Sequence, residues 1–188
     1  MSICGRHEAS TKGSSTRTTR DDFCRIFTQD MKSLYLLSFL LTADHKQAEH
    51  CFAAGMEDCV AGNPVFKEWA NAWSRRAIIK NAIRVVSPLS HPTNPGGPAL
   101  NVVEWESDLS PALAVVTQLE PLERFAYVMS VLERYSDHEC STLLITTKEQ
   151  VVAARTRALQ RLSVSDGINA SPAEVVGKLL TAPILTRV

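Results

Sequence analysis

The sequence predicts an all-α protein made of two small helical domains joined by a linker rich in proline and glycine. Apolar residues recur at three- and four-residue intervals in several long stretches, which is the pattern of amphipathic helices. Between these stretches, Ser87–Gly97 reads SPLSHPTNPGG, a composition that sustains neither a helix nor a central strand. We therefore expect a disordered tail at 1–21, an N-terminal domain at 22–86, a linker at 87–108, a C-terminal domain at 109–162 and an extension at 163–188.

The overall charge is balanced. The chain of 188 residues carries 20 Lys and Arg against 20 Asp and Glu, so its formal net charge is zero. This excludes a protein coated in positive charge for indiscriminate nucleic-acid binding, but it permits local basic patches. No stretch is long and apolar enough to cross a bilayer, and the first residues lack the apolar core of a secretory signal. We expect a cytoplasmic protein without membrane insertion.

In the N-terminal half, the segment 22–41 predicts one buried helix. After an interruption, Asp44 is a plausible cap for a second helix to about Cys59, which Gly55 weakens and which Gly62-Asn63-Pro64 ends. The acidic residues of this helix predict a surface for a basic partner protein. They are Glu49, Glu57 and Asp58.

A third helix is predicted at 66–86. Trp69 and Trp73 lie on one face of it, and we expect them to pack between helices rather than to stack on bases. Its cations are crowded on other faces with few acids opposite them, which favours contact with a DNA backbone over a merely solvated face. The predicted DNA-binding residues here are Arg75, Arg76, Lys80, Asn81 and Arg84.

The C-terminal half contains a predicted helix-turn-helix. A first helix, 121–135, begins with proline, and Ser136 with Glu139 forms a capping box that starts a short helix at 137–144. The β-branched run 145–147 suits a turn, and a basic helix follows at 148–162. This geometry places a helix in the major groove of DNA, although an ordinary three-helix unit with arginines on a solvated face has the same periodicity.

Two sets of residues, one in each half, share the order and spacing of a known family. In the C-terminal half they are Leu119, Pro121, Glu123-Arg124, Tyr135-Ser136, Glu139, Leu143-Leu144, Val151, Arg157-Ala158-Leu159 and Leu162. In the N-terminal half they are Leu34-Tyr35, Asp44, Ala48-Glu49, Phe66, Trp73 and Asn81. Through these residues, both halves resemble bacterial RNA polymerase sigma factors of the small extracytoplasmic-function (ECF) type. The resemblance implies a transcription initiation factor whose partners are core RNA polymerase, promoter DNA and an anti-sigma protein. Its C-terminal domain would read the minus-thirty-five element, and its N-terminal domain would bind the polymerase clamp and a minus-ten base.

The helix at 148–162 supplies the candidate contacts to the upstream promoter element. Thr147, Glu149 and Gln150 at its start can approach base edges, and the cations along it can neutralise phosphates. Those cations are Lys148, Arg155, Arg157 and Arg161. Val152 and Ala154 stand where the family commonly has Lys or Arg, so we expect weak binding with a shallow salt dependence.

Departures from the family pattern keep two alternatives open. His50, Ala53 and the run Ile83-Arg84-Val85 replace residues that the N-terminal domain usually carries. The substitutions at His50, Ala53, Val152 and Ala154 motivate a degenerate sigma-like regulator or adaptor without promoter opening. A stand-alone helix-turn-helix regulator is the other alternative.

Enzyme chemistry has little support in the sequence. There is no phosphate-binding glycine loop, no nucleophile elbow and no HExxH motif. The five cysteines lack metal-ligand spacing, and the gap between Cys51 and Cys59 beside His50 is not standard for zinc. We expect buried, reduced thiols, no metal, no cofactor and no catalytic activity.

Overall fold

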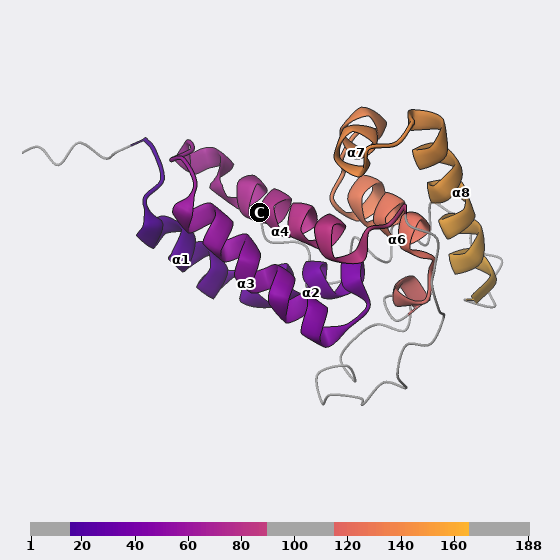
Figure 1. The fold of residues 1–188 in the computed structure, drawn as a ribbon, viewed down its shortest axis with the longest axis horizontal. Helices are drawn as coiled ribbons and strands as arrows, with labels where there is room; N and C mark the ends of the chain where they lie inside the picture. The colour runs from indigo at the N-terminus through magenta and orange to yellow at the C-terminus, as the bar shows by residue number, and fades with distance from the viewer. Residues whose placement is uncertain (1–15, 90–114, 166–188) are drawn as a thin grey trace, which may run out of the picture.

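The computed structural model describes residues 16–89 and 115–165, and within these ranges the regular structure is helical (Figure 1). The one pairing of extended segments there is an isolated antiparallel bridge between Arg17 and Phe66. The all-α prediction is therefore confirmed. The elements are α1 (Arg20–Gln29), α2 (Met31–Thr42), α3 (His45–Ala61), η1 (Lys67–Trp69), α4 (Ala70–Val86), α6 (Pro121–Tyr127), η3 (Val128–Leu132), α7 (Asp137–Leu144) and α8 (Lys148–Ser165). Among these helices, none is long and apolar enough to span a membrane.

Three predicted segments fall wholly or mostly outside the described residues: the tail before 16, the linker after 89 and the C-terminal extension. At the start of the predicted C-terminal domain, residues 115–117 are helical. The boundary predicted at residue 22 is wrong, because ordered structure begins earlier. The backbone N–H of Thr18 donates to Val65 O at 2.7 Å, and that of Lys67 donates to Thr16 O at 3.0 Å.

The N-terminal half is a bundle of α1, α2, α3 and α4. The single helix predicted at 22–41 is wrong in one respect, because it is divided at Asp30 into α1 and α2. Helix α1 begins with a capping box between Thr19 and Asp22, and α3 begins at the predicted cap, where Asp44 accepts from Gln47 N at 2.8 Å. Helix α2 is buried along most of its length, because α3 and α4 pack against it.

Gly55 allows α3 and α4 to approach closely. A Cβ atom at this position would lie 2.9 Å from Ile78 Cγ1 and 3.2 Å from the Ile78 backbone nitrogen. Because ordinary van der Waals contact needs more room, a methyl group there must displace α4. The glycine that weakens the helix locally is thus required by packing.

We expect Gly55→Ala to lower the free energy of unfolding by about 1–2 kcal/mol, because overpacking outweighs the gain in helix propensity of about 1 kcal/mol. Propensity alone predicts the opposite sign. Chemical denaturation followed by circular dichroism measures the change. Ala53→Gly, at an exposed position of the same helix, is the control. It should lower the free energy of unfolding only by the difference in helix propensity between alanine and glycine. A stabilised Gly55→Ala protein would contradict the close approach of the two helices.

The C-terminal half consists of α6, η3, α7 and α8. The helix predicted at 121–135 begins at Pro121 as expected, but its second part is the π-helical segment η3, and Arg134 (φ 58°) ends it. Helix α7 has the predicted bounds and capping box, in which Ser136 N donates to Glu139 Oε2 at 2.9 Å. Helix α8 starts at the predicted residue, Lys148, and continues to Ser165.

The two halves lie side by side, as Figure 1 shows for the indigo-to-magenta and orange-to-yellow helices. Helix α6 packs against α2, and the buried hydrophobic side chains of both halves form one continuous cluster. The side chain of Arg124 crosses this junction. Its Nε donates to Leu41 O at 3.0 Å, and one terminal nitrogen donates to Leu119 O at 3.0 Å and Thr117 O at 3.2 Å.

Candidate nucleic-acid interface

Three aromatic side chains are exposed along η1 and α4. Phe66, Trp69 and Trp73 are 39%, 57% and 41% exposed, so the prediction that both tryptophans pack between helices is wrong. The Phe66 and Trp69 rings meet edge to face with centroids 5.0 Å apart, and Lys80 Nζ lies 5.9 Å from the centre of the Trp73 ring. We call Phe66, Trp69, Trp73 and Lys80 the aromatic face.

The tryptophans point outward because smaller side chains fill the inner face of α4. The buried residues of this helix are Ala70, Ser74, Ala77, Ile78, Ile79, Asn81 and Ala82. Small residues at these positions let α4 lie close to α3, and the rotation that buries them turns positions 69 and 73 toward solvent. The spacing of the small residues in the sequence indicates which face of α4 is buried. The prediction chose the opposite face because tryptophan is a large apolar residue.

A groove of about 590 Å³ lies beside the aromatic face, between α4 and the chain that connects η3 to α7. From α4 it is lined by Trp69, Ala72, Trp73, Arg75, Arg76 and Lys80, and from the C-terminal half by Glu133, Arg134, Tyr135 and Glu139. Burial raises the pKa of Tyr135 despite the nearby Arg76 guanidinium. Hydrogen bonds from Ser136 lower the pKa of Glu139, and the charge of Arg76 adds to this effect.

Arg75 is bound to the C-terminal half across this groove. Its guanidinium makes a bidentate contact with the Glu133 carboxylate, with Nε 2.5 Å from Oε2, and it also donates to Ser33 Oγ at 3.0 Å. Burial by itself lowers the pKa of Arg75, but hydrogen bonding and charge from Glu133 outweigh it, and the pKa is raised. This predicted DNA contact is therefore already occupied by a carboxylate.

Two other predicted DNA contacts, Asn81 and Arg84, interact with a predicted polymerase contact, Asp58. Asn81 is buried, and its amide donates to Asp58 Oδ2 at 2.9 Å and to Ala77 O at 3.0 Å. Arg84 donates to Asn81 Oδ1 at 3.2 Å and lies 3.5 Å from Asp58. Because its amide is held inside this network, Asn81 braces α3 against α4.

The predicted acidic surface on α3 is not one patch. Glu49, Glu57 and Asp58 are all exposed, but they lie on a continuous α-helix. At about 100° per residue, positions nine apart lie on opposite sides of a helix, so Glu49 and Asp58 cannot face the same partner surface. Glu49 and Glu57 are the two that remain together as a candidate partner contact.

The start of α8 presents polar side chains to solvent. Thr147, Lys148, Glu149 and Gln150 are all exposed. The Gln150 backbone N–H donates to Thr147 Oγ1 at 3.3 Å, and the Gln150 side-chain oxygen accepts from Thr147 N at 3.4 Å. This reciprocal pair caps the helix and holds the predicted base-reading residues in place. A backbone hydrogen bond, with the Thr147 hydroxyl, lowers the pKa of Glu149, which stays ionised.

The arginines further along α8 are paired within the C-terminal half. Arg155 bonds Asp137, Arg157 Nε donates to Glu123 Oε1 at 2.9 Å, and Arg161 lies 3.1 Å from Glu120 and 3.2 Å from Glu123. Glu123 is only 1% exposed, so its pairs with Arg157 and Arg161 hold α8 on α6 as well as presenting charge. The outer parts of Arg157 and Arg161 remain half exposed.

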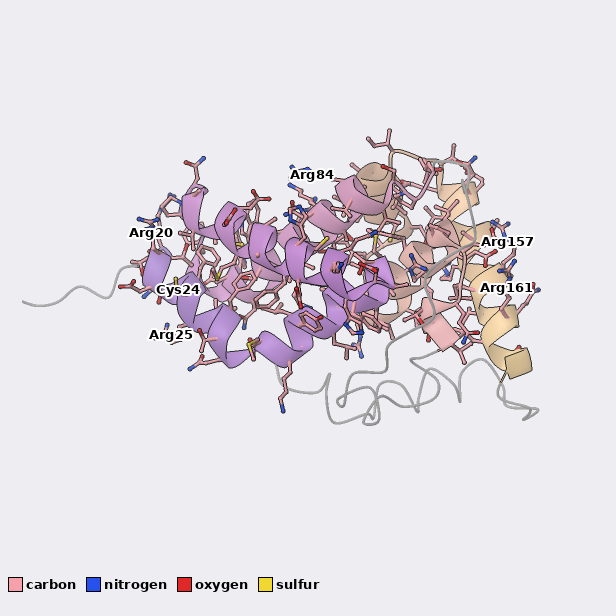
Figure 2. All side chains as sticks on the ribbon, turned by 60° about the horizontal axis from the view of Figure 1, so that its bottom comes forward. Arg20, Cys24, Arg25, Arg84, Arg157 and Arg161 are labelled. Atoms are coloured by element: carbon pink, nitrogen blue, oxygen red, sulfur yellow. The ribbon has the colours of Figure 1, made fainter. Side chains whose placement is uncertain are left out.

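Ala154 is fully buried, so the prediction that it replaces a phosphate-binding cation is wrong. A lysine or arginine there would face the core of the C-terminal half. Val152 is 39% exposed and remains a surface position without charge. Figure 2 shows Arg157 and Arg161 next to each other on α8, with Arg84 well apart from them on the N-terminal half. The structure thus groups the predicted DNA contacts into two separate sets.

The described cysteines are free thiols, as expected. Cys51, Cys59 and Cys140 are buried, and burial raises the pKa of each to about 11, whereas Cys24 is exposed. Across residues 16–89 and 115–165, no group of three or more His, Cys, Asp or Glu side chains is arranged to hold a metal ion.

The fold and these surfaces define an all-helical protein with an exposed aromatic and cationic face in one half and a capped polar helix start in the other. Comparison with family models, curated proteins and solved structures finds no match to this chain.

Proposed function

We propose that this protein is a transcription initiation factor resembling an ECF sigma factor, which binds core RNA polymerase in the cytoplasm and directs it to promoter DNA. The observation that carries the proposal is the aromatic face, where Trp69 and Trp73 lie exposed beside Lys80. Exposed tryptophans next to cations are what a single nucleic-acid strand requires, because bases stack on the rings while cations hold the backbone.

The C-terminal half supports the same function through α7 and α8. These helices are joined by residues 145–147, with Ile145 in a left-handed conformation (φ 54°) that ends α7 sharply. A short turn between two helices, with the second exposing polar residues at its start, is the arrangement that reads the major groove. Thr147 and Gln150 are placed for base edges, and Lys148 for a phosphate.

Binding by α8 alone should be weak. Three of its four cations are already paired with carboxylates, so fewer of them release counterions from DNA. The affinity of this half becomes useful when polymerase and the aromatic face bind at the same time, because linked sites act at a high effective concentration.

A degenerate sigma-like regulator or adaptor, which would bind polymerase without opening promoters, is the second candidate. The observation that favours it is that several predicted DNA contacts of the N-terminal half already have partners within the protein. Asn81 is buried in a network with Asp58 and Arg84, and Arg75 is bound to Glu133. A protein with these residues occupied keeps the fold but offers fewer contacts to a melted strand.

Co-elution of the full chain with bacterial core polymerase, followed by transcription in vitro and permanganate probing of unpaired thymines, tests the proposal. We expect a stable complex, a changed choice of promoters and reactive thymines near the start site. A complex without reactive thymines would favour the regulator instead. If no complex forms and the choice of promoters does not change, both candidate functions are overturned.

A further inference from the structure

The contact between Arg75 and Glu133 joins the two halves at the edge of the aromatic face. Glu133 directly follows η3, and its backbone N–H donates to Val128 O at 2.9 Å. Arg134 then adopts its left-handed conformation. The end of this π-helical segment therefore fixes the Glu133 side chain, which is only 6% exposed, against α4.

A carboxylate and a phosphate present the same pair of oxygens to a guanidinium. A bidentate contact uses the planar fork of the arginine, so one fork cannot bind Glu133 and a phosphate in the same way at the same time. The neighbouring Arg76 shares the groove with Tyr135 and Glu139 of the C-terminal half. Trp69 at the end of η1 and Trp73 and Lys80 on α4 stay exposed.

We infer that Glu133 acts as an internal competitor for nucleic acid: with the two halves in contact, its carboxylate occupies the phosphate-binding fork of Arg75, and strand binding along α4 displaces it. This inference rests on the proposed binding of nucleic acid by the aromatic face. By linkage, whatever weakens the contact between Arg75 and Glu133 strengthens strand binding, and strand binding loosens the contact by the same factor.

Glu133→Gln keeps the shape of the side chain and removes its charge. We expect the full-length variant to bind a short fluorescein-labelled single-stranded oligothymidylate about fivefold or more tightly than the wild type, measured by fluorescence anisotropy. The slope of log affinity against log salt should steepen by about 0.7, because one more cation contacts the strand. An unchanged or weaker affinity overturns the inference.

Two further variants separate competition from a general charge effect. Asp21→Asn changes the net charge equally at an exposed position of α1 and should leave the affinity unchanged. In an Arg75→Ala background, Glu133→Gln should give no further gain, because the fork for which Glu133 competes is gone. A gain of equal size in either case would show general electrostatics instead.

A measurement on the wild-type protein tests the inference even if a variant folds poorly. In the wild type, Tyr135 N donates to Met129 O at 2.9 Å next to the contact. Saturating oligothymidylate should speed hydrogen exchange in the segment 133–135, and unchanged exchange would contradict displacement. If no variant binds the strand, both the inference and the nucleic-acid role of the aromatic face are wrong. If all bind it equally, only the inference is wrong.

Discussion

Trp69→Ala and Trp73→Ala are each expected to weaken binding of single-stranded DNA by about tenfold or more while leaving the protein folded. Stacking of a base on an aromatic side chain contributes about 1–3 kcal/mol, so removing one ring removes most of that contribution. Fluorescence anisotropy with a labelled oligonucleotide measures the affinity. Because both side chains are largely exposed, their loss should lower the free energy of unfolding by only about 1 kcal/mol or less.

Two controls define what would contradict this expectation. Met31→Ala removes another exposed hydrophobic side chain, 53% exposed and located on α2 rather than on η1 or α4, and should not change DNA binding. Phe27→Ala removes a side chain that is 2% exposed and should cost about 3–5 kcal/mol in stability. Tryptophan variants that behave like Phe27→Ala would restore the packing role predicted from sequence. Tryptophan variants that bind DNA as well as Met31→Ala does would show that the aromatic face is not a binding site.

The starts of α7 and α3, which local hydrogen bonds cap, were predicted to the residue. The capping box of Ser136 and Glu139 placed the start of α7, and Asp44 placed the start of α3. Each cap involves side chains three residues from the backbone groups that they bind, so sequence spacing alone specifies it. The break at Asp30 was not predictable in the same way, because apolar residues continue on both sides and neither proline nor glycine marks it.

Features that depend on distant residues were not predictable. The arginines of α8 form a basic stripe in sequence, but Arg157 bonds a carboxylate 34 residues earlier. Arg75 bonds one 58 residues later. Nothing in local periodicity reports such partners, and therefore the sequence overstated how much positive charge is free to bind phosphates. Which face of α4 is buried likewise depends on Gly55 of α3, whose missing side chain leaves room for Ile78 of α4.

Arg124→Met is expected to lower the free energy of unfolding by about 2–4 kcal/mol, the largest loss for any single arginine considered. The guanidinium is buried, and its acceptors are backbone carbonyls of Leu41 and Thr42 in one half and of Thr117 and Leu119 in the other. Removing it leaves carbonyls at the end of α2 without a donor, and hydrogen bonds from a charged donor contribute about 1.5–3 kcal/mol each. Relief of its desolvation offsets only part of this loss.

Chemical denaturation at neutral pH measures the change in the free energy of unfolding while Arg124 is charged. Burial lowers the pKa of Arg124 to about 10, so the side chain keeps its proton well above neutrality. Above about pH 10 the folded protein releases this proton while the unfolded chain still holds it. The contribution of Arg124 to the free energy of unfolding therefore becomes more favourable as the pH rises. Arg25→Met is the matched control, since the Arg25 side chain is 62% exposed where it pairs with Asp22, and its loss should cost about 1 kcal/mol or less.

The consequence of Arg124→Met for binding follows from the same contacts. Since the side chain connects α2 to α6, its loss should loosen the junction that also holds Glu133 against Arg75. We therefore expect the variant to bind single-stranded DNA more tightly even though it is less stable. Lower stability together with unchanged affinity would show that the junction and the aromatic face are independent. A stability change below about 1 kcal/mol would show that water replaces the guanidinium at these carbonyls.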